Sequence, residues 1–388
     1  MKKSRRAIYL DHAATTPVDP RVVKKMQPYF TKAFGNPSSL YKAGIEAKTA
    51  LEDARSKIGF ALRASGSEVV FTSGGTESIN LALQGIARAH GMKGRIIVSS
   101  IEHHAVLRCA EYLIKQGVDV VEIPVDSEGN ISVDALEKAL TPETFLVSLM
   151  YANNEVGTIQ PLAKFAQLIR KKEKEFSSRM YFHTDACQAP GSLPLNVREL
   201  GVDLLTLNAS KMYGPKGVGI LYVRRGVKIE PVIFGGNQER AMRSGTENVA
   251  GAVGMAEALA LVCGDVQKER DRLMKLRDDF MKKIEKIPGA RINGARKNRL
   301  ANNINVTFDG LKGEAIVIHL DEYNIQASTG SACTSTELEP SHVLLAMGKS
   351  DAEAEASVRF TLGRTTTKQD LDYTAKVLQE IVARLQNS

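Results

Sequence analysis

Residues suited to covalent and acid–base chemistry follow the ends of several apolar runs in this chain. Lys211 comes shortly after the run at residues 204–207, and Asp185 comes shortly after the run at residues 180–183. The run that ends at Phe71 leads into Thr72-Ser73-Gly74-Gly75-Thr76-Glu77 and then into a predicted helix. A lysine amine can bond to a carbonyl carbon. A carboxylate that directly follows a buried strand in the sequence needs a cationic partner. A glycine-rich helix start attracts phosphate.

Pyridoxal 5'-phosphate (PLP) is a cofactor that needs all three of these groups. It needs a lysine for a Schiff base, a carboxylate that keeps its pyridine nitrogen protonated, and a phosphate cup. Lys211, Asp185 and the pair Gly75-Thr76 supply them. The glycine stretch is not a nucleotide P-loop, because no Gly-Lys-Ser/Thr follows it.

Other polar residues occupy the same position relative to predicted strands. Glu102-His103-His104 follows the run at residues 95–98, and Asn153-Asn154-Glu155 follows the run at residues 145–149. Gln188 comes three residues after Asp185. A single histidine at such a point is more often a helix cap or a packed residue, so His103 alone indicates little.

The elements that must position these residues alternate along the chain. Short runs rich in Val and Ile predict strands at residues 68–71, 95–98, 118–122, 145–149, 180–183 and 204–207. Helices are predicted between several of them, for example at 78–90 and 133–140. This alternation predicts an α/β fold with a mostly parallel sheet flanked by helices on both faces. Ligands of such sheets bind at the carboxyl ends of the strands, where the polar residues above are found.

A second, α+β region is expected after the sheet. The pattern predicts one long helix at 248–286, strands at 304–308 and 358–362, and a last helix at 368–385. We expect a large PLP-binding domain at 14–250 and a smaller domain formed by 1–13 and 251–388. Near the start, Asp19 and Pro20 predict the N-cap and first turn of a helix over 22–30.

Composition narrows the class of protein. The chain has 388 residues, 43% hydrophobic and 25% charged, with a formal net charge of +8. It has no apolar run of about 18 residues, and the apolar stretch near its N-terminus is too short for the core of a signal peptide. A soluble cytoplasmic protein without membrane contact is therefore expected. The basic clusters at 2–6 and 170–175 lack interleaved aromatic residues, so we expect no direct nucleic-acid binding.

The four cysteines are Cys109, Cys187, Cys263 and Cys333, without CxxC pairing. They suggest neither a disulfide framework nor a zinc site, and no metal is expected. Cys109 and Cys263 lie in apolar helical patterns, which is typical of packed cysteines. Cys333 instead lies among Gly, Ser, Ala and Thr, which favours an accessible nucleophile whose thiol needs help to ionise at neutral pH.

With these residues in view, the chain resembles a cysteine desulfurase, in the class-V aminotransferase family of fold-type-I PLP enzymes. The resemblance runs from Tyr9 to the last helix, nearly the whole chain. The motifs that carry it are Phe71 to Ser78, Glu102-His103, Asn153-Asn154-Glu155, Asp185-Ala186-Cys187-Gln188, Lys211-Met212-Tyr213-Gly214-Pro215-Lys216-Gly217, Arg243-Ser244-Gly245-Thr246 and Ser328-Thr329-Gly330-Ser331-Ala332-Cys333-Thr334-Ser335.

The resemblance implies a role for each matching residue. Those implied for the cofactor are Gly75, Thr76, Asn208 and Ser210 around the phosphate, Thr246 from the second subunit of a homodimer, His103 stacked on the ring and moving protons, and Asn154 and Gln188 at the ring oxygen. Arg359 would bind the substrate carboxylate, which suits its planar pair of donors, and Asn154 would also contact the substrate. Ser210 stands where many members have histidine, Asn208 where many have serine, and Cys187 where threonine is usual.

The implied reaction converts L-cysteine to L-alanine. Lys211 and Cys333, with His103, would carry it: the sulfur moves to Cys333 as a persulfide and then to an acceptor protein, either an iron–sulfur scaffold or a tRNA-thiolating enzyme. Three alternatives remain open. The chain could be a selenocysteine lyase or another class-V PLP enzyme, a binding protein that keeps PLP structurally, or a nucleic-acid binder that uses its basic surface.

Overall fold

The structure is a computed structural model of the chain and describes residues 6–264, 266–330 and 339–387. Cys333 therefore lies outside the described residues.

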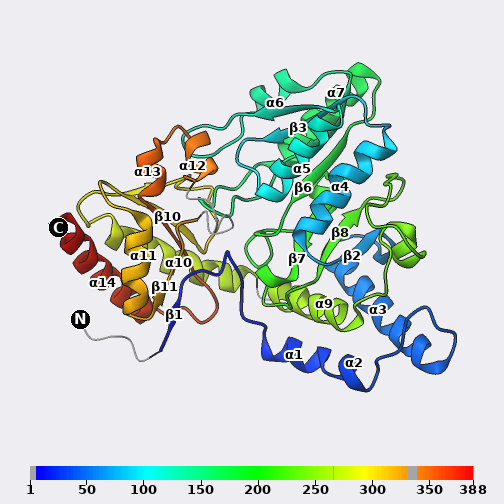
Figure 1. Cartoon of the computed structure of the whole chain (residues 1–388), viewed down its shortest axis with the longest axis horizontal. Helices are drawn as coiled ribbons and strands as arrows, with labels where there is room; N and C mark the ends of the chain where they lie inside the picture. Colours follow the sequence, from blue (N-terminus) through cyan, green and yellow to red (C-terminus); the bar gives the residue numbers. More distant parts are fainter. Residues whose placement is uncertain (1–5, 265, 331–338, 388) are drawn as a thin grey trace.

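A seven-stranded sheet forms the centre of the larger part of the molecule (Figure 1). Its strand order is β2-β8-β7-β6-β5-β3-β4, and β8 runs in the opposite direction to the other strands of this sheet. The strands are β2 (Val69–Thr72), β3 (Arg95–Ser99), β4 (Asp119–Ile123), β5 (Thr144–Ser148), β6 (Tyr181–Asp185), β7 (Leu204–Asn208) and β8 (Gly219–Val223). The mostly parallel α/β sheet predicted from the sequence is confirmed.

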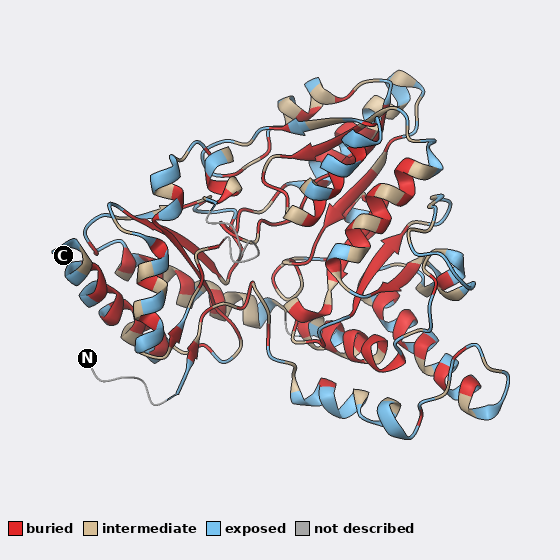
Figure 2. Cartoon of the chain, viewed as in Figure 1, coloured by how far each residue is buried: buried red, intermediate tan, exposed pale blue. Residues whose placement is uncertain are grey.

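Helices cover both faces of this sheet, because its apolar residues alternate between two cores (Figure 2). Ile96 packs with α4 and α5, whereas the next residue, Ile97, packs on the opposite face. The helices α4 (Gly75–Ala89) and α5 (His104–Lys115) cover one face. The other is covered by α3 (Lys42–Ala61), α6 (Val133–Ala139), α7 (Leu162–Phe176), α8 (Val197–Leu200) and α9 (Val249–Gly264).

The smaller part of the molecule has its own core and contains both ends of the described chain (Figure 1). An antiparallel sheet of order β12-β10-β9 packs with the helices around it, and β1 pairs in parallel with β11. The elements are β1 (Ile8–Tyr9), α10 (Val266–Ile284), β9 (Ala290–Asn293), β10 (Asn303–Phe308), α11 (Gly313–Glu322), β11 (Ile325–Gln326), α12 (His342–Ala346), α13 (Asp351–Glu355), β12 (Ser357–Thr361) and α14 (Lys368–Gln386). Short 3-10 turns are η1 (Gly66–Glu68), η2 (Ala209–Lys211) and η3 (Gln238–Ala241).

The prediction of one long helix over 248–286 is wrong. Two helices, α9 and α10, take its place, and their axes meet at 71°. Met255 and Leu259 of α9 pack in the core of the large sheet, whereas Phe280 of α10 packs in the smaller core. Most of α9 thus lies after residue 250, the expected domain boundary, and packs with the large sheet.

The predicted helix over 22–30 is also two helices, α1 (Pro20–Met26) and α2 (Pro28–Thr31). Asp19 is the N-cap of α1, as expected, and its side chain accepts a hydrogen bond from the Arg21 amide. The break coincides with Pro28, which lacks the amide hydrogen that a continuing helix requires.

No single helix in the described part of the chain is long and apolar enough to cross a membrane. The bent pair α9 and α10 passes that test only when the two are taken together.

Candidate active site

Lys211 lies on η2, directly after β7, at the carboxyl edge of the large sheet. Asn208 starts this turn, and its side-chain oxygen accepts hydrogen bonds from the amide and the hydroxyl of Ser210, at 3.2 and 3.1 Å. The Lys211 Nζ donates to the Ala13 carbonyl at 2.9 Å and to the Ala14 carbonyl. Gln188 Nε2 donates to the same Ala13 oxygen at 3.1 Å. The structure thus brings Lys211 and Gln188 together across the N-terminal segment.

Asp185 ends β6, the strand next to β7, and is 8% exposed. Its Oδ1 accepts a hydrogen bond from the Cys187 amide at 2.9 Å. In the strand pairing, Asp185 is opposite Thr206 of β7, two residues before Asn208. A buried carboxylate at this position is suited to a cationic ligand group such as a protonated pyridine nitrogen.

The start of α4 forms a cup that side chains would fill. Gly74 is the N-cap of α4 and Gly75 is its first residue; no side chain caps this end, and the amides of a first helical turn have no partner within the helix. A Cβ built on Gly75 would lie 3.0 Å from Cys187 Sγ and 3.6 Å from Asn208 Cβ. The backbone at Gly75 therefore faces the same space as Asn208. Free amides, an amide side chain and the Ser210 hydroxyl are a donor set that fits the phosphate of PLP.

His103 and Thr76 line one cavity of about 530 Å³ together with His104. His103 is the N-cap of α5, and its Nδ1 accepts a hydrogen bond from the Ala105 amide at 3.1 Å. His103 is thus a helix cap, which the sequence left open as an alternative. The residue is also half-buried where it lines the cavity. Thr246 is exposed in a loop that the Arg243–Glu77 ion pair, at 2.8 Å, ties to the first turn of α4.

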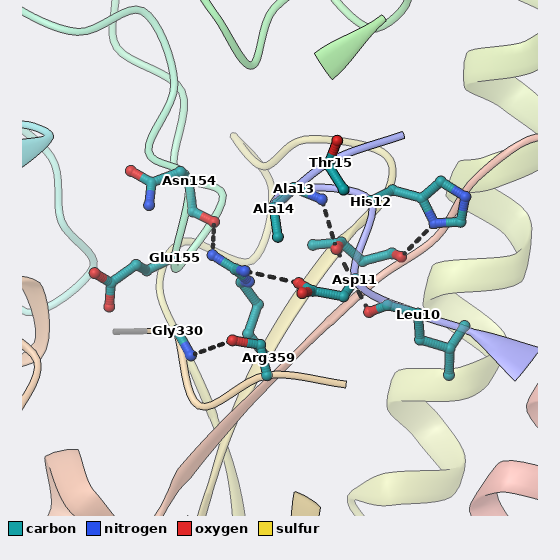
Figure 3. A network of polar contacts seen from close by, with 12 residues as sticks. Leu10, Asp11, His12, Ala13, Ala14, Thr15, Asn154, Glu155, Gly330 and Arg359 are labelled. Atoms are coloured by element: carbon teal, nitrogen blue, oxygen red, sulfur yellow. Dashed lines mark hydrogen bonds and ion pairs between the residues drawn. The ribbon is translucent and has the colours of Figure 1, made fainter. Parts of the chain in front are cut away.

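Arg359 lies on β12 in the smaller part and is 3% exposed, so it is not a surface arginine. Its Nη2 forms an ion pair with Asp11 Oδ1 at 2.8 Å, and its Nη1 donates to the Asn154 carbonyl at 3.1 Å (Figure 3). Its Nε has no hydrogen-bond partner among the described residues. Arg359 therefore retains one buried donor next to the loop that carries Asn154.

Glu102, next to His103, is fully buried, and burial raises its pKa to about 8. Its Oε1 accepts hydrogen bonds from the Ser99 hydroxyl at 2.6 Å and the Met150 amide at 2.9 Å, and the negative charge of Asp185 raises the pKa further. Glu102 is consequently largely uncharged at neutral pH.

Glu102→Gln is expected to flatten the pH dependence of stability above pH 7. The folded protein keeps the Glu102 proton up to about pH 8, whereas an unfolded glutamate loses it near pH 4.3, so the free energy of unfolding falls as pH rises between these values. The drop from pH 7 to pH 8 should be smaller in the variant by about 1 kcal/mol, measured by chemical denaturation.

The titration of His183 does not affect stability between pH 7 and pH 8, because burial lowers the pKa of His183 to about 4. Its contribution to stability is lost only as pH falls from about 6.5 towards 4. Glu122→Gln, at an exposed position on β4, is the matched control and should keep the original pH dependence. An unchanged pH dependence in Glu102→Gln would contradict this account of Glu102.

The three described cysteines are poorly suited to act as nucleophiles. Burial raises the pKa of Cys109 to about 12 and also raises the pKa of Cys263. The pKa of Cys187 is raised by burial and then by the charge of Asp185. Since the thiolate is the reactive form, these three are packed residues at neutral pH, as predicted for Cys109 and Cys263.

Some residues of the site were not singled out from the sequence. The carbonyls of Ala13 and Ala14 contact Lys211, and Asp11 pairs with Arg359, yet these partners are far apart in sequence. The one available signal is that Asp11 directly follows the apolar Ile8-Tyr9-Leu10, which places a carboxylate at the end of a buried strand.

Comparison with known proteins gives a consistent set of relatives. The class-V aminotransferase family model matches residues 8–374. Cysteine desulfurase IscS of Dictyoglomus turgidum is 51% identical over 98% of this chain and 96% of its own length, and IscS of Methanosarcina thermophila is 48% identical over 98% and 93%. Among solved structures, a NifS-like protein has a TM-score of 0.91 at 39% identity, covering 98% of this chain and 100% of that one. SspA in complex with cysteine has a TM-score of 0.80 at 35% identity, covering 92% and 98%.

Proposed function

Since the chain belongs to the class-V aminotransferase family and, within it, to the cysteine desulfurases, we propose that Lys211, Asp185 and Gly75 hold PLP at the carboxyl edge of the large sheet. One observation carries this proposal: Asp185 ends β6, Lys211 follows the adjacent strand β7, and the open cup of α4 faces Asn208 beside them. PLP, when bound through an amine to a carbon skeleton, acts as a sink for the electrons released at that carbon.

Three residues of the chain would each have a separate role in the reaction. The Lys211 amine would bond to the cofactor carbonyl, and after release it would take the α-proton of the substrate. Asp185 would hold a proton on the pyridine nitrogen. The buried Nε of Arg359, which has no hydrogen-bond partner among the described residues, lies beside the Asn154 loop and would donate to the substrate carboxylate.

We propose that Cys333 receives the sulfur of L-cysteine. Its thiolate would attack the substrate sulfur, so that an S–S bond forms as the substrate carbon–sulfur bond breaks. The electron pair of the broken bond stays on the carbon skeleton, which leaves as L-alanine after protonation. Support comes from the small, polar neighbours of Cys333 in the sequence and from the raised pKa of the three other cysteines.

The partners belong to this proposal as well. A second copy of the chain would supply Thr246 to the phosphate, which is supported by the exposure of Thr246 in a loop tied to α4. The persulfide sulfur would pass to an acceptor thiol of an iron–sulfur scaffold or a tRNA-thiolating enzyme, in the cytoplasm. The name IscS, carried by the relatives, supports the scaffold.

Asp185→Asn tests the proposal at the cofactor. An asparagine of the same shape should still admit PLP, so the visible absorbance of the holoenzyme should remain. Alanine formation should fall on the order of 10²- to 10⁴-fold, because the pyridine nitrogen loses the carboxylate that keeps it protonated.

Asp119→Asn, at an exposed ion pair with Arg95 on the edge of the same sheet, is the matched control and should keep full activity. Alanine formation within about threefold of the original in Asp185→Asn would contradict the proposed role, since even a single general acid–base contribution is typically larger.

A further inference from the structure

The short turn η3 has a left-handed backbone over three consecutive residues. Glu239, Arg240 and Ala241 have φ angles of +46°, +57° and +63°. None of them is glycine, and a residue with a side chain pays a steric cost in this region of backbone space. Such a conformation persists only where surrounding contacts hold it, so the contacts of η3 must compensate for its strain.

Glu239 forms a buried ion pair with Arg55 of α3. The two Nη atoms of Arg55 donate to the two carboxylate oxygens of Glu239 at 2.7 and 2.8 Å, and the two residues are 3% and 5% exposed. Two parallel, charge-assisted hydrogen bonds are among the stronger polar contacts in proteins. Loss of either partner would leave the other charge buried without this counter-charge, so the pair holds Glu239 firmly in the turn.

The same side chains bind the outer edge of β2, the last strand on one side of the large sheet. Its inner edge pairs with β8. At the outer edge, the Phe71 amide donates to Glu239 Oε2 at 2.8 Å. The Val69 carbonyl accepts hydrogen bonds from Arg55 at 2.7 Å and from Arg240 at 2.6 Å. The turn η3 therefore fixes the strand that leads directly into the start of α4.

The other side of that helix start is held by the residue that follows η3 closely. Arg243 Nε donates to Glu77 Oε1 at 2.8 Å, and the second oxygen of Glu77 accepts a hydrogen bond from the Ser73 amide at 2.9 Å. Residues 73–77, here called the phosphate cup, include the glycines at which the PLP phosphate is proposed to bind. One short segment, residues 239–243, thus contacts the chain on both sides of the phosphate cup.

We propose that Glu239 is a positioning residue for the cofactor, because it holds η3 in the left-handed form that keeps residues 239–243 against the phosphate cup. This inference rests on the proposed binding of PLP at Gly75. A cup that is ordered before the phosphate arrives binds it more tightly, since less conformational freedom is lost on binding. The contacts act on the phosphate end of PLP, so the affinity for pyridoxal, which lacks the phosphate, should depend little on Glu239.

Asp203 offers a matched control for Glu239. It is 0% exposed, forms an ion pair with Arg179 at 3.0 Å and accepts a hydrogen bond from the amide of Phe182 on β6 at 2.9 Å. It directly precedes β7, at the edge of the large sheet opposite the phosphate cup. Glu239→Gln and Asp203→Asn thus each replace a buried, paired carboxylate with an amide of the same shape, but only Glu239→Gln affects the cup.

Dissociation constants for PLP and for pyridoxal should be measured on the full-length chain freed of cofactor. Glu239→Gln should weaken PLP binding about tenfold or more and pyridoxal binding by less than about threefold. Asp203→Asn should lower the urea midpoint of unfolding but keep both dissociation constants within about twofold of the original. Adding Ala241→Gly to Glu239→Gln should improve PLP binding at least about threefold, since glycine adopts the left-handed backbone without strain.

The inference is overturned if Glu239→Gln weakens PLP and pyridoxal equally, which is the result of a merely structural role, or if its PLP affinity matches that of Asp203→Asn. If Glu239→Gln does not fold, Arg243→Met tests the same contacts from the side of α4. A PLP affinity within about twofold of the original in Arg243→Met then overturns the inference, and a loss of about tenfold that spares pyridoxal supports it.

The original protein tests the proposed function separately. If it binds PLP no more tightly than pyridoxal, the phosphate cup itself is wrong and the inference fails with it. Tight binding of PLP that is indifferent to both Glu239 and Arg243 overturns the role of Glu239 alone.

Discussion

Replacing Lys211 with alanine is expected to reduce L-alanine formation from L-cysteine by at least about 10⁴-fold. The amine of Lys211 has two roles in the proposed reaction, as the covalent attachment of the cofactor and as the base at the α-carbon. In the described part of the chain, Nζ of Lys211 is held by the Ala13 carbonyl at the carboxyl edge of the sheet, whereas Lys216 in the same stretch is exposed. Single-turnover alanine assays on purified protein with added PLP provide the measurement.

Lys216→Ala is the matched control and should retain activity within about threefold, since loss of a surface contact costs little. Borohydride reduction should fix the cofactor to the peptide that contains Lys211 in the original protein and in Lys216→Ala. Recovery of the cofactor on another lysine, or turnover by Lys211→Ala near the original rate, would contradict the assignment.

Replacing Cys333 with alanine is expected to abolish alanine formation while leaving the cofactor chemistry before it intact. Exchange of the substrate α-proton with deuterated water depends on Lys211 and should continue near the original rate. The carbon–sulfur bond, however, has lost its acceptor, and we expect a decrease of at least about 10³-fold in alanine. The two rates are followed by NMR on the same sample.

Cys263→Ala controls for the loss of a thiol elsewhere, since burial raises the pKa of Cys263 and it packs against the large core. It should behave like the original protein. Turnover that persists in Cys333→Ala would instead favour a selenocysteine lyase or a transaminase of the same fold, because neither needs that thiol.

Much of the fold could be predicted because its signals are local. Runs of Val and Ile separated by helical patterns predicted six strands of the large sheet, and the likeness to class-V aminotransferases confirms the fold-type-I expectation. The same local logic placed Asp185 and Lys211 at strand ends. β8 was not among the predicted strands. Its antiparallel direction comes from its pairing with β2 and β7, which are distant in sequence or follow from tertiary structure.

The errors arose where tertiary packing decides. Residues 249–264 and 266–284 are both helical, so one helix was predicted across them. They bury different surfaces: α9 is apolar on nearly all sides and enters the large core, whereas α10 is strongly charged and packs along one face. That change in character from α9 to α10 was the available signal for two helices.

The partners of the site residues could not be predicted for the same reason. Asp11 meets Arg359 and Ala13 meets Lys211 only because β1 pairs with β11 in the smaller part, so that the residues after β1 reach both β12 and the edge of the large sheet. The chemistry of Lys211 could be predicted from its residue type and position, whereas the contacts that orient it required the structure. The role of Cys333, outside the described residues, stays a prediction.

Mass spectrometry of the protein after brief treatment with L-cysteine tests the central claim most directly. In a sample whose absorbance confirms bound PLP, the account predicts an added sulfur atom, about 32 Da, on the peptide that contains Cys333, and its removal by a reducing thiol. The peptides that contain Cys109, Cys187 and Cys263 should keep their original mass, since the pKa of each of these thiols is raised. A Cys333 peptide of unchanged mass in PLP-loaded protein that releases alanine would contradict the account.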